Sequence, residues 1–204
     1  MMKTTIRQIK TALILLISFT LLTGLVYPII VTLIAQLLFP YEANGSLVQK
    51  EGKLIGSALI GQSFTQPDYF GGRPSATTPF PYNAENSSGS NMGPSNPDYL
   101  AQVKERVSRL HEANPQNNQL IPVDLVTASG SGLDPDISPF AAYYQISRIA
   151  KARHLSEENI YTLIQTLKKK RIFKLFGEPR VNVLQLNMAL DNLGTSNDGQ
   201  TSKS

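Results

Sequence analysis

Residues 12–39, "ALILLISFTLLTGLVYPIIVTLIAQLLF", divide the chain into an apolar segment and a mostly polar remainder. No charged residue occurs from Thr11 to Tyr41, and this run exceeds the roughly 20 apolar residues that cross a bilayer as a helix. A cleaved signal peptide has a shorter apolar region, of about 7 to 15 residues, and ends in a small-residue cleavage motif that is absent here. The sequence therefore predicts a transmembrane helix over residues 11–39.

The charges beside this span predict its direction. The preceding flank carries Lys3, Arg7 and Lys10 and no acid, whereas in the twenty residues after the span two lysines are balanced by two glutamates. Cytoplasmic flanks carry the positive excess. We expect residues 1–10 in the cytoplasm, the chain in the cell membrane as a single-pass protein, and the remaining domain outside the cytoplasm.

Two features inside the span concern its shape and its contacts. The ring of Pro28 would press on the carbonyl of Gly24, which predicts a kink in the outer half. Small and hydroxylated residues on one helical face let helices approach closely in lipid, although such residues are also common in isolated spans. The predicted docking face comprises Thr20, Thr23, Gly24 and Tyr27.

The rest of the chain suits one domain of the α+β class. After the span about 165 of the 204 residues remain, a usual size for one mixed α/β domain, here predicted over 40–193 and followed by a flexible tail at 194–204. A net charge of +4 without interleaved aromatic and basic residues excludes a nucleic-acid-binding surface. The absence of cysteine excludes disulfides, thiolate metal sites and cysteine nucleophiles.

Local signals predict the elements of this domain. We expect one or two strands within 52–64, a helix capped by Asn96 that ends before Pro115, a strand over 120–127, a helix from Ser138 to about Arg153, and a third helix capped by Ser156. Residues 178–193 fit a strand or a helix, and a possible cap at Asn182 favours the helix.

The stretch "GQSFTQPDYFGGRPSA", residues 61–76, opens a segment from 62 to 96 without helical or strand periodicity. Such length without secondary structure indicates disorder or function, and its aromatic residues argue against disorder. We expect an ordered loop that contacts a partner, with a lid over the domain's own core as the alternative.

Candidate catalytic groups are few. The two histidines, His111 and His154, have no spacing typical of a metal site, so no metal is expected. Ser129 follows a predicted strand but has no histidine placed to activate it, and Asp134 and Asp136 flank a proline as turn residues do. The basic run at 168–171 is expected to close a helix. The residues thus indicate a non-catalytic subunit.

Five stretches in this order and spacing resemble the C subunit of the bacterial Kdp potassium-transporting ATPase. They are the N-terminal span, "LIGQSFTQPDYFGGRPSA", "SGSNMGPSNP", "IPVDLVTASGSGLDPDISP" and "GEPRVNVLQLNMALD". The resemblance covers about residues 8–193. Asp136 stands where the family often has histidine, and the basic stretch at 168–171 is atypical.

The resemblance implies an accessory subunit of a high-affinity potassium uptake complex. Its partners would be a subunit with the potassium filter, a P-type ATPase subunit that hydrolyses ATP, and membrane lipid. The family is described as a catalytic chaperone that raises the ATP affinity of the ATPase subunit, with a glutamine that matches Gln145 here. No firmly bound cofactor is expected, and ATP would be met only through the complex. A domain outside the membrane cannot reach cytoplasmic ATP, so the predicted topology and the nucleotide role of Gln145 disagree.

We expect the outer domain to pack on the filter subunit while the span holds the membrane subunits together. The alternatives are a membrane-anchored extracytoplasmic hydrolase that uses Ser129 or the Asp134 and Asp136 pair, and an anchored ligand-binding domain. The predicted interface residues are Gln62, Phe64, Tyr69, Phe70, Arg73, Asn91, Asn96 and Arg180.

Overall fold

The N-terminal apolar segment forms one long helix. The computed structural model describes residues 2–201 and the side chains of residues 4–193. Helix α1 (Met2–Leu21) continues through a π-helical turn (Leu22–Val26) into α2 (Tyr27–Leu38). Thr4–Leu38, 35 residues that include an 18-residue stretch of mean hydropathy 2.4, is long and apolar enough to cross a membrane by length and composition. A short helix α3 (Pro40–Ala43) follows.

The π turn lies where the proline predicts a disturbance. The backbone N–H of Tyr27 donates to the carbonyl of Leu22, five residues earlier, and Pro28 follows directly. A π turn lets the carbonyl of Gly24 avoid the proline ring without a break in the helix. Because the turn adds a residue, the predicted docking face of Thr20, Thr23, Gly24 and Tyr27 does not keep purely α-helical spacing.

The chain separates into two compact units, Met1–Ile55 and Gly56–Ser204. Strands β1 (Leu47–Lys50) and β2 (Lys53–Ser57) form a two-stranded sheet. Glu51 and Gly52 join them with φ values of +52° and +75°, the backbone that a tight two-residue hairpin requires. The strand predicted after Gly52 is therefore confirmed as β2, while the residues that follow it form a turn.

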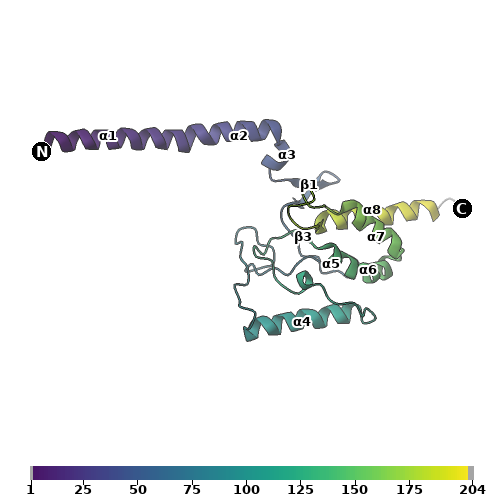
Figure 1. Cartoon of the computed structure of the whole chain (residues 1–204). Helices are drawn as coiled ribbons and strands as arrows, with labels where there is room; N and C mark the ends of the chain where they lie inside the picture. Colours follow the sequence, from purple (N-terminus) through teal and green to yellow (C-terminus); the bar gives the residue numbers. More distant parts are fainter. Residues whose placement is uncertain (1, 202–204) are drawn as a thin grey trace. The chain divides into compact units, whose positions relative to one another are not determined.

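Helices dominate the second unit. They are α4 (Pro97–Ala113), α5 (Pro139–Tyr144), α6 (Ile146–Arg153), α7 (Glu157–Leu167) and α8 (Val183–Thr201). Figure 1 shows α5 and α6 between α4 on one side and α7 and α8 on the other. Strand β3 (Asp136–Ile137) pairs antiparallel with β4 (Val181–Asn182) and joins the segment before α5 to the start of α8.

The core of this unit lies between α5, α6, α7 and α8. Its fully buried aliphatic side chains include Ile149, Ile160, Ile164 and Leu186. Phe70, from the long loop, is also 0% exposed and belongs to the same cluster. One residue of the irregular loop therefore completes a helical core.

The predicted helix starts are confirmed by their caps. The Asn96 side chain accepts from the N–H groups of Asp98 and Tyr99, and the hydroxyls of Ser138 and Ser156 accept from residues three positions later. The ambiguous segment 178–193 contains both alternatives, because β4 ends at Asn182, whose Oδ1 then accepts from the N–H of Gln185. The helix predicted from Ser138 to Arg153 is two helices that meet at Gln145.

Two element predictions are wrong. Residues 120–127 form no strand but a 3₁₀ turn (Val123–Leu125), since Pro122 has no N–H for a ladder and the carboxylate of Asp124 accepts from the backbone and hydroxyl of Ser138. The basic run does not close a helix either. Helix α7 ends at Leu167, and residues beyond Lys168 belong to a hairpin with Lys169 paired to Arg180.

Residues 202–204 lie outside the described part of the chain, and α8 continues to Thr201. The flexible tail at 194–204 therefore stays a prediction.

Candidate functional site

The centre of the 61–76 loop is held by two side-chain amides. The backbone N–H of Phe70 donates to Asn187 Oδ1 at 2.8 Å, and Asn187 Nδ2 donates back to the Phe70 carbonyl at 3.0 Å. Gly71 is held in the same way by Gln145, with distances of 2.8 and 3.2 Å. Each amide makes the two hydrogen bonds that a neighbouring strand would make, one to the N–H and one to the carbonyl of the same residue. An extended backbone can therefore be buried without a sheet. We call Gln145 and Asn187 the amide clamp.

Gln145 is fully engaged by the domain itself. It lies 3% exposed at the junction of α5 and α6. Besides its bonds to Gly71, its Nε2 donates to the Ala141 carbonyl at 3.1 Å and its Oε1 accepts from Arg148 Nη2 at 2.9 Å. The amide has two donors and two acceptor positions, and all four are used. A direct bond from Gln145 to a nucleotide would have to replace one of these contacts.

Two arginines of α6 hold the preceding part of the loop. Arg148 donates to the carbonyls of Pro67 and Tyr69. Arg153 Nε donates to the Asp68 carbonyl at 2.7 Å, and its guanidinium lies 4.4 Å from the centre of the Tyr69 ring. Burial lowers the pKa of Arg148 from its usual value, an effect that the nearby Asp68 carboxylate opposes.

The carboxylate of Asp191 on α8 completes this attachment. It accepts from Arg153 Nη2 and from the Tyr69 hydroxyl, both at 2.9 Å. The Tyr69 ring also contacts that of Phe64, with 5.7 Å between their centres. Residues 64–71 are therefore tied to α5, α6 and α8 at once.

A second group of contacts joins the loop to the turn at residues 128–134. Arg73 Nη1 lies 3.2 Å from Asp134 Oδ2, and its Nη2 donates to the Ala128 carbonyl at 3.4 Å. The Tyr82 hydroxyl donates to the carbonyl of Arg73. Burial, helped by the charge of Asp134, raises the pKa of Tyr82 to about 12.

The turn at residues 128–134 requires glycine at position 132. Gly132 has φ +69°, and a Cβ there would lie 2.5 Å from the carbonyl oxygen of Ser88. The backbone N–H of Ser88 donates in turn to the Ser131 carbonyl at 2.9 Å. Close approach of two backbones therefore requires glycine at this position.

The candidate catalytic residues have structural contacts. Ser129 is 3% exposed, and its backbone N–H donates to the Pro74 carbonyl at 3.2 Å. Asp134 pairs with Arg73, and Asp136 Oδ2 lies 2.8 Å from Arg180 Nε. Burial raises the pKa of Asp136 while Arg180 counters this shift. Each carboxylate is matched to its own arginine, which is how structural ion pairs are arranged.

The histidines lie at helix ends. His111 is exposed in the last turn of α4, and His154 caps the C-terminus of α6 with a left-handed backbone. Among the residues that the structure describes, no group of three or more histidines and carboxylates could hold a metal ion.

The remaining predicted interface residues differ in exposure. Phe70 lies in the core and offers no surface to a partner, which corrects its assignment as an interface side chain. Gln62 and Phe64 are half-buried, and Asn91 and Arg180 are exposed. Asn96 is half-buried and occupied as the cap of α4.

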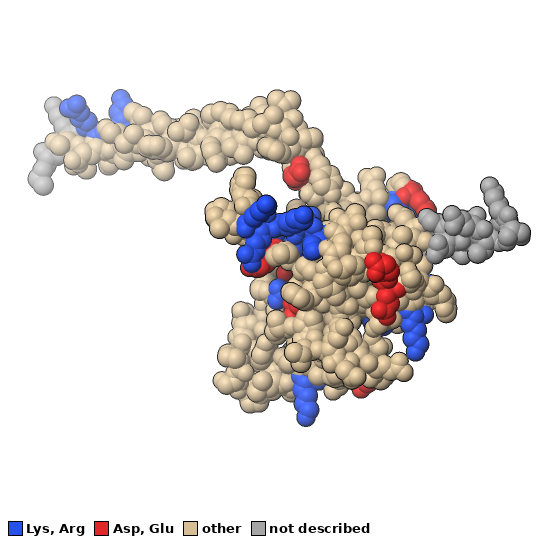
Figure 2. Space-filling model, turned by 45° about the vertical axis from the view of Figure 1, so that its right-hand side comes forward, with Lys and Arg blue, Asp and Glu red and all other residues tan. Residues whose placement is uncertain are grey.

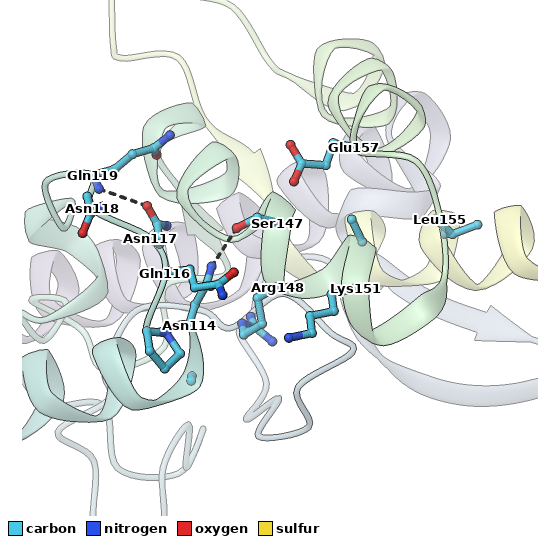
Figure 3. Close-up of a pocket in the computed structure, with 13 residues that line it drawn as sticks. Asn114, Gln116, Asn117, Asn118, Gln119, Ser147, Arg148, Lys151, Leu155 and Glu157 are labelled. Carbon is cyan, nitrogen blue, oxygen red and sulfur yellow. Dashed lines mark hydrogen bonds between the residues drawn. The ribbon is translucent and has the colours of Figure 1, made fainter.

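Several hollows mark the surface of this unit. One, of about 1070 Å³, lies between the turn at residues 114–119 and α6 (Figure 3). There Asn114 Nδ2 donates to Ser147 Oγ at 2.7 Å, and Asn117 donates to the Tyr144 carbonyl at 3.1 Å. These two amides attach the turn to α5 and α6.

Another hollow, of about 740 Å³, has a mainly apolar lining. Leu120, Val123 and Phe140 line it and are 94%, 69% and 74% exposed, and Arg180 lines it as well. We call Leu120, Val123 and Phe140 the apolar patch. No sequence pattern indicated this patch, because Leu120 and Val123 were expected in a strand and Phe140 in a helix, and the three residues meet only in the folded domain.

Sequence reasoning also missed Arg148, Arg153, Asn187 and Asp191. One signal was present for Asn187, because this polar residue interrupts the apolar face of Val183, Leu186 and Leu190. A buried polar side chain requires partners, so its position indicated a specific contact.

Comparison with known proteins decides the family. Residues 9–192 match the family model KdpC, described as "K+-transporting ATPase, c chain". The chain belongs to the KdpC family. It is 57% identical to the potassium-transporting ATPase KdpC subunit of Methylococcus capsulatus, over 92% of this chain and 99% of that protein. It is 53% identical to the KdpC subunit of Rhodopseudomonas palustris, over 91% and 98% of the two chains.

Membership in the KdpC family confirms the resemblance drawn from the sequence motifs. Relatives of this family are subunits of a potassium-transporting ATPase. An accessory role in potassium uptake follows for this chain, together with association with other Kdp subunits.

Proposed function

We propose that this chain is a non-catalytic accessory subunit that assembles and stabilises a high-affinity potassium uptake complex. The observation that carries this proposal is that the polar side chains that could serve a reaction instead hold the domain's own loop and turn. They are Gln145, Arg73, Asp134 and Asp136. A hydrolase would need an exposed and activated nucleophile. Ser129 is buried instead.

The partners that we propose are the subunit with the potassium filter and the P-type ATPase subunit. The long helix would lie among membrane subunits, while the domain would pack on the filter subunit. Large exposed apolar side chains gathered in one place are typical of protein interfaces. The apolar patch is therefore the proposed contact, with the exposed Asn91 and Arg180 as further candidates.

The domain is proposed to lie outside the cytoplasm, on the basis of the charges that flank the span. This placement is tested with single cysteines in the cysteine-free chain, Ser108→Cys in α4 and Thr4→Cys at the start of the N-terminal helix. Both positions are exposed, unlike Ser46. We expect a membrane-impermeant maleimide to label the Ser108→Cys variant in intact cells and the Thr4→Cys variant only after lysis. The reverse result would place the domain in the cytoplasm.

We further propose that any rise in ATP affinity is transmitted through the complex. The support is that Gln145 already makes four hydrogen bonds inside the domain. The proposed chaperone role thus would not require that this chain contact nucleotide. Full potassium-dependent ATPase activity in complexes with Ser129→Ala or Asp136→Asn would support the absence of catalysis by this chain.

A further inference from the structure

The segment from Lys168 to Arg180 forms a hairpin beyond the end of α7. Its arms are joined by two hydrogen bonds between the backbones of Lys169 and Arg180, at 2.9 and 3.1 Å. Nearer the tip, the Ile172 N–H donates to the Phe176 carbonyl at 2.9 Å. An ion pair of 2.6 Å between Arg171 and Glu178 also crosses the hairpin.

The tip of this hairpin is apolar and exposed. Phe173 is 88% exposed and Leu175 is 72% exposed, and Ile172 and Phe176 are also mostly exposed. Phe173 and Lys174 have φ values of +52° and +61°, a left-handed backbone that is unfavourable for both residues. The chain therefore maintains an unfavourable turn whose large apolar side chains face solvent. We call Ile172, Phe173, Leu175 and Phe176 the hairpin tip.

Basic residues flank the tip. Lys168, Lys169, Lys170, Arg171 and Lys174 precede or interrupt it, whereas Glu178 is the one acid between residues 168 and 178. Figure 2 shows that Lys and Arg side chains gather closely at one place on the visible face of the domain, with acidic side chains beside part of the group. Exposed apolar residues next to lysines are typical of segments that lie in the interface of an anionic membrane.

We propose that the hairpin tip inserts into the headgroup region of the anionic bilayer that holds the N-terminal helix, with Lys170 and Lys174 contacting lipid phosphates. The same chain carries a helix that can cross a membrane, so the domain is tethered to the segment that would enter lipid. Binding of the tip is then intramolecular and requires only a few favourable contacts. The positive charge selects an anionic surface over a zwitterionic one.

This inference does not depend on which side of the membrane the domain occupies, nor on the proposed contact with the filter subunit. The principal rival is a partner protein that covers the tip in the assembled complex. A test on the full-length chain without other subunits distinguishes the two, because a lipid surface is present and a partner protein is not.

The chain contains no tryptophan, so the variant Phe173→Trp carries a unique fluorescent probe. The full-length variant is placed in lipid nanodiscs of phosphatidylcholine with or without phosphatidylglycerol. We expect a blue shift of tryptophan emission, and quenching by lipids with brominated acyl chains, in the anionic discs. Removal of one lysine, by Lys170→Gln or Lys174→Gln, is expected to reduce the ratio of inserted to free tip about fivefold.

The matched control is Phe80→Trp, because Phe80 is also exposed but lies in a segment without flanking lysines. Its tryptophan should be quenched in neither lipid. Melting curves that match the unsubstituted chain verify that both variants fold. If the Phe173→Trp emission is unshifted and unquenched in anionic discs, or quenched equally in both lipids and in the lysine variants, the proposal is wrong.

Discussion

At the scale of single residues, the amide clamp accounts for the position of Gln145. The side chain satisfies the N–H and the carbonyl of Gly71, two backbone groups that the helical core offers no strand to pair with. Loss of both partners leaves these groups unsatisfied, at about 1–3 kcal/mol for each buried group.

We therefore predict that Gln145→Ala lowers the free energy of unfolding by about 2–4 kcal/mol. Denaturant unfolding of the full-length chain in detergent, followed by circular dichroism, measures this change. Gln119→Ala is the control, because that side chain is exposed, and should leave stability unchanged. Unchanged stability of Gln145→Ala together with a raised KM for ATP in the assembled complex would instead indicate direct contact with nucleotide.

Tyr82 makes the stability of the domain depend on alkaline pH. Its pKa is raised from 10.0 to about 12, mainly because the ring is buried, with a further contribution from Asp134. Between these two pH values the folded chain keeps the phenolic proton while the unfolded chain releases it. Stability from this group is therefore complete below pH 10 and is lost as the pH rises toward 12.

The predicted loss over this window is on the order of 2 kcal/mol. Ultraviolet titration of the eight tyrosines should include one component near pH 12 that is missing in Tyr82→Phe. Tyr161→Phe should leave that component in place, since Tyr161 lies exposed on α7. Persistence of the component in Tyr82→Phe would assign it to another tyrosine.

At the scale of elements, α4 depends on its cap. Asn96 Oδ1 accepts from Asp98 N at 2.9 Å and from Tyr99 N at 3.4 Å. We predict that Asn96→Ala reduces the free energy of unfolding by about 1 kcal/mol, and that Asn96→Asp restores most of it because aspartate also caps. Thermal unfolding of the full-length variants measures both. A variant Asn96→Asp that is stable but fails to join the complex would show that Asn96 contacts a partner.

These elements also show which parts of the fold could be predicted. The starts of α4, α5 and α7 are encoded within four residues, by a capping side chain and a following proline or acid, so sequence reasoning placed them. The turn at Val123–Leu125 depends on Asp124 binding Ser138, fourteen residues away, and was missed. The burial of Phe70 depends on Asn187, which is 117 residues distant, and the local pattern around Asn187 indicates a buried contact without identifying its partner.

At the scale of the whole molecule, the 61–76 loop is held by its own domain, and the apolar patch is the contact that we propose for a partner. We predict that Phe140→Asp and Leu120→Asp prevent co-purification with the filter subunit, because a buried unpaired charge is strongly unfavourable at an interface. The melting temperature of the isolated chain should change little, since both side chains are exposed. Phe80→Asp is the matched control for an exposed apolar side chain.

A different result would place the interface at the 61–76 loop. If Phe140→Asp and Leu120→Asp complexes assemble normally while Tyr69→Ala complexes do not, and Tyr69→Ala melts as the unsubstituted chain does, the 61–76 loop is the interface. The bonds from Tyr69 to Asp191 and from Arg153 to the loop lead us to expect lost stability in Tyr69→Ala instead.

The amide clamp also sets an order of events during synthesis. Phe70 and Gly71 leave the ribosome long before Asn187, and domains fold as their sequence emerges. Gln145, which holds Gly71, emerges earlier, but the backbone groups of Phe70 have no side-chain partner until Asn187 of α8 has been translated. A ribosome that stalls before residue 187 would thus leave the backbone groups of Phe70 without their amide partner. Such an incompletely folded chain would be open to proteases until α8 is complete.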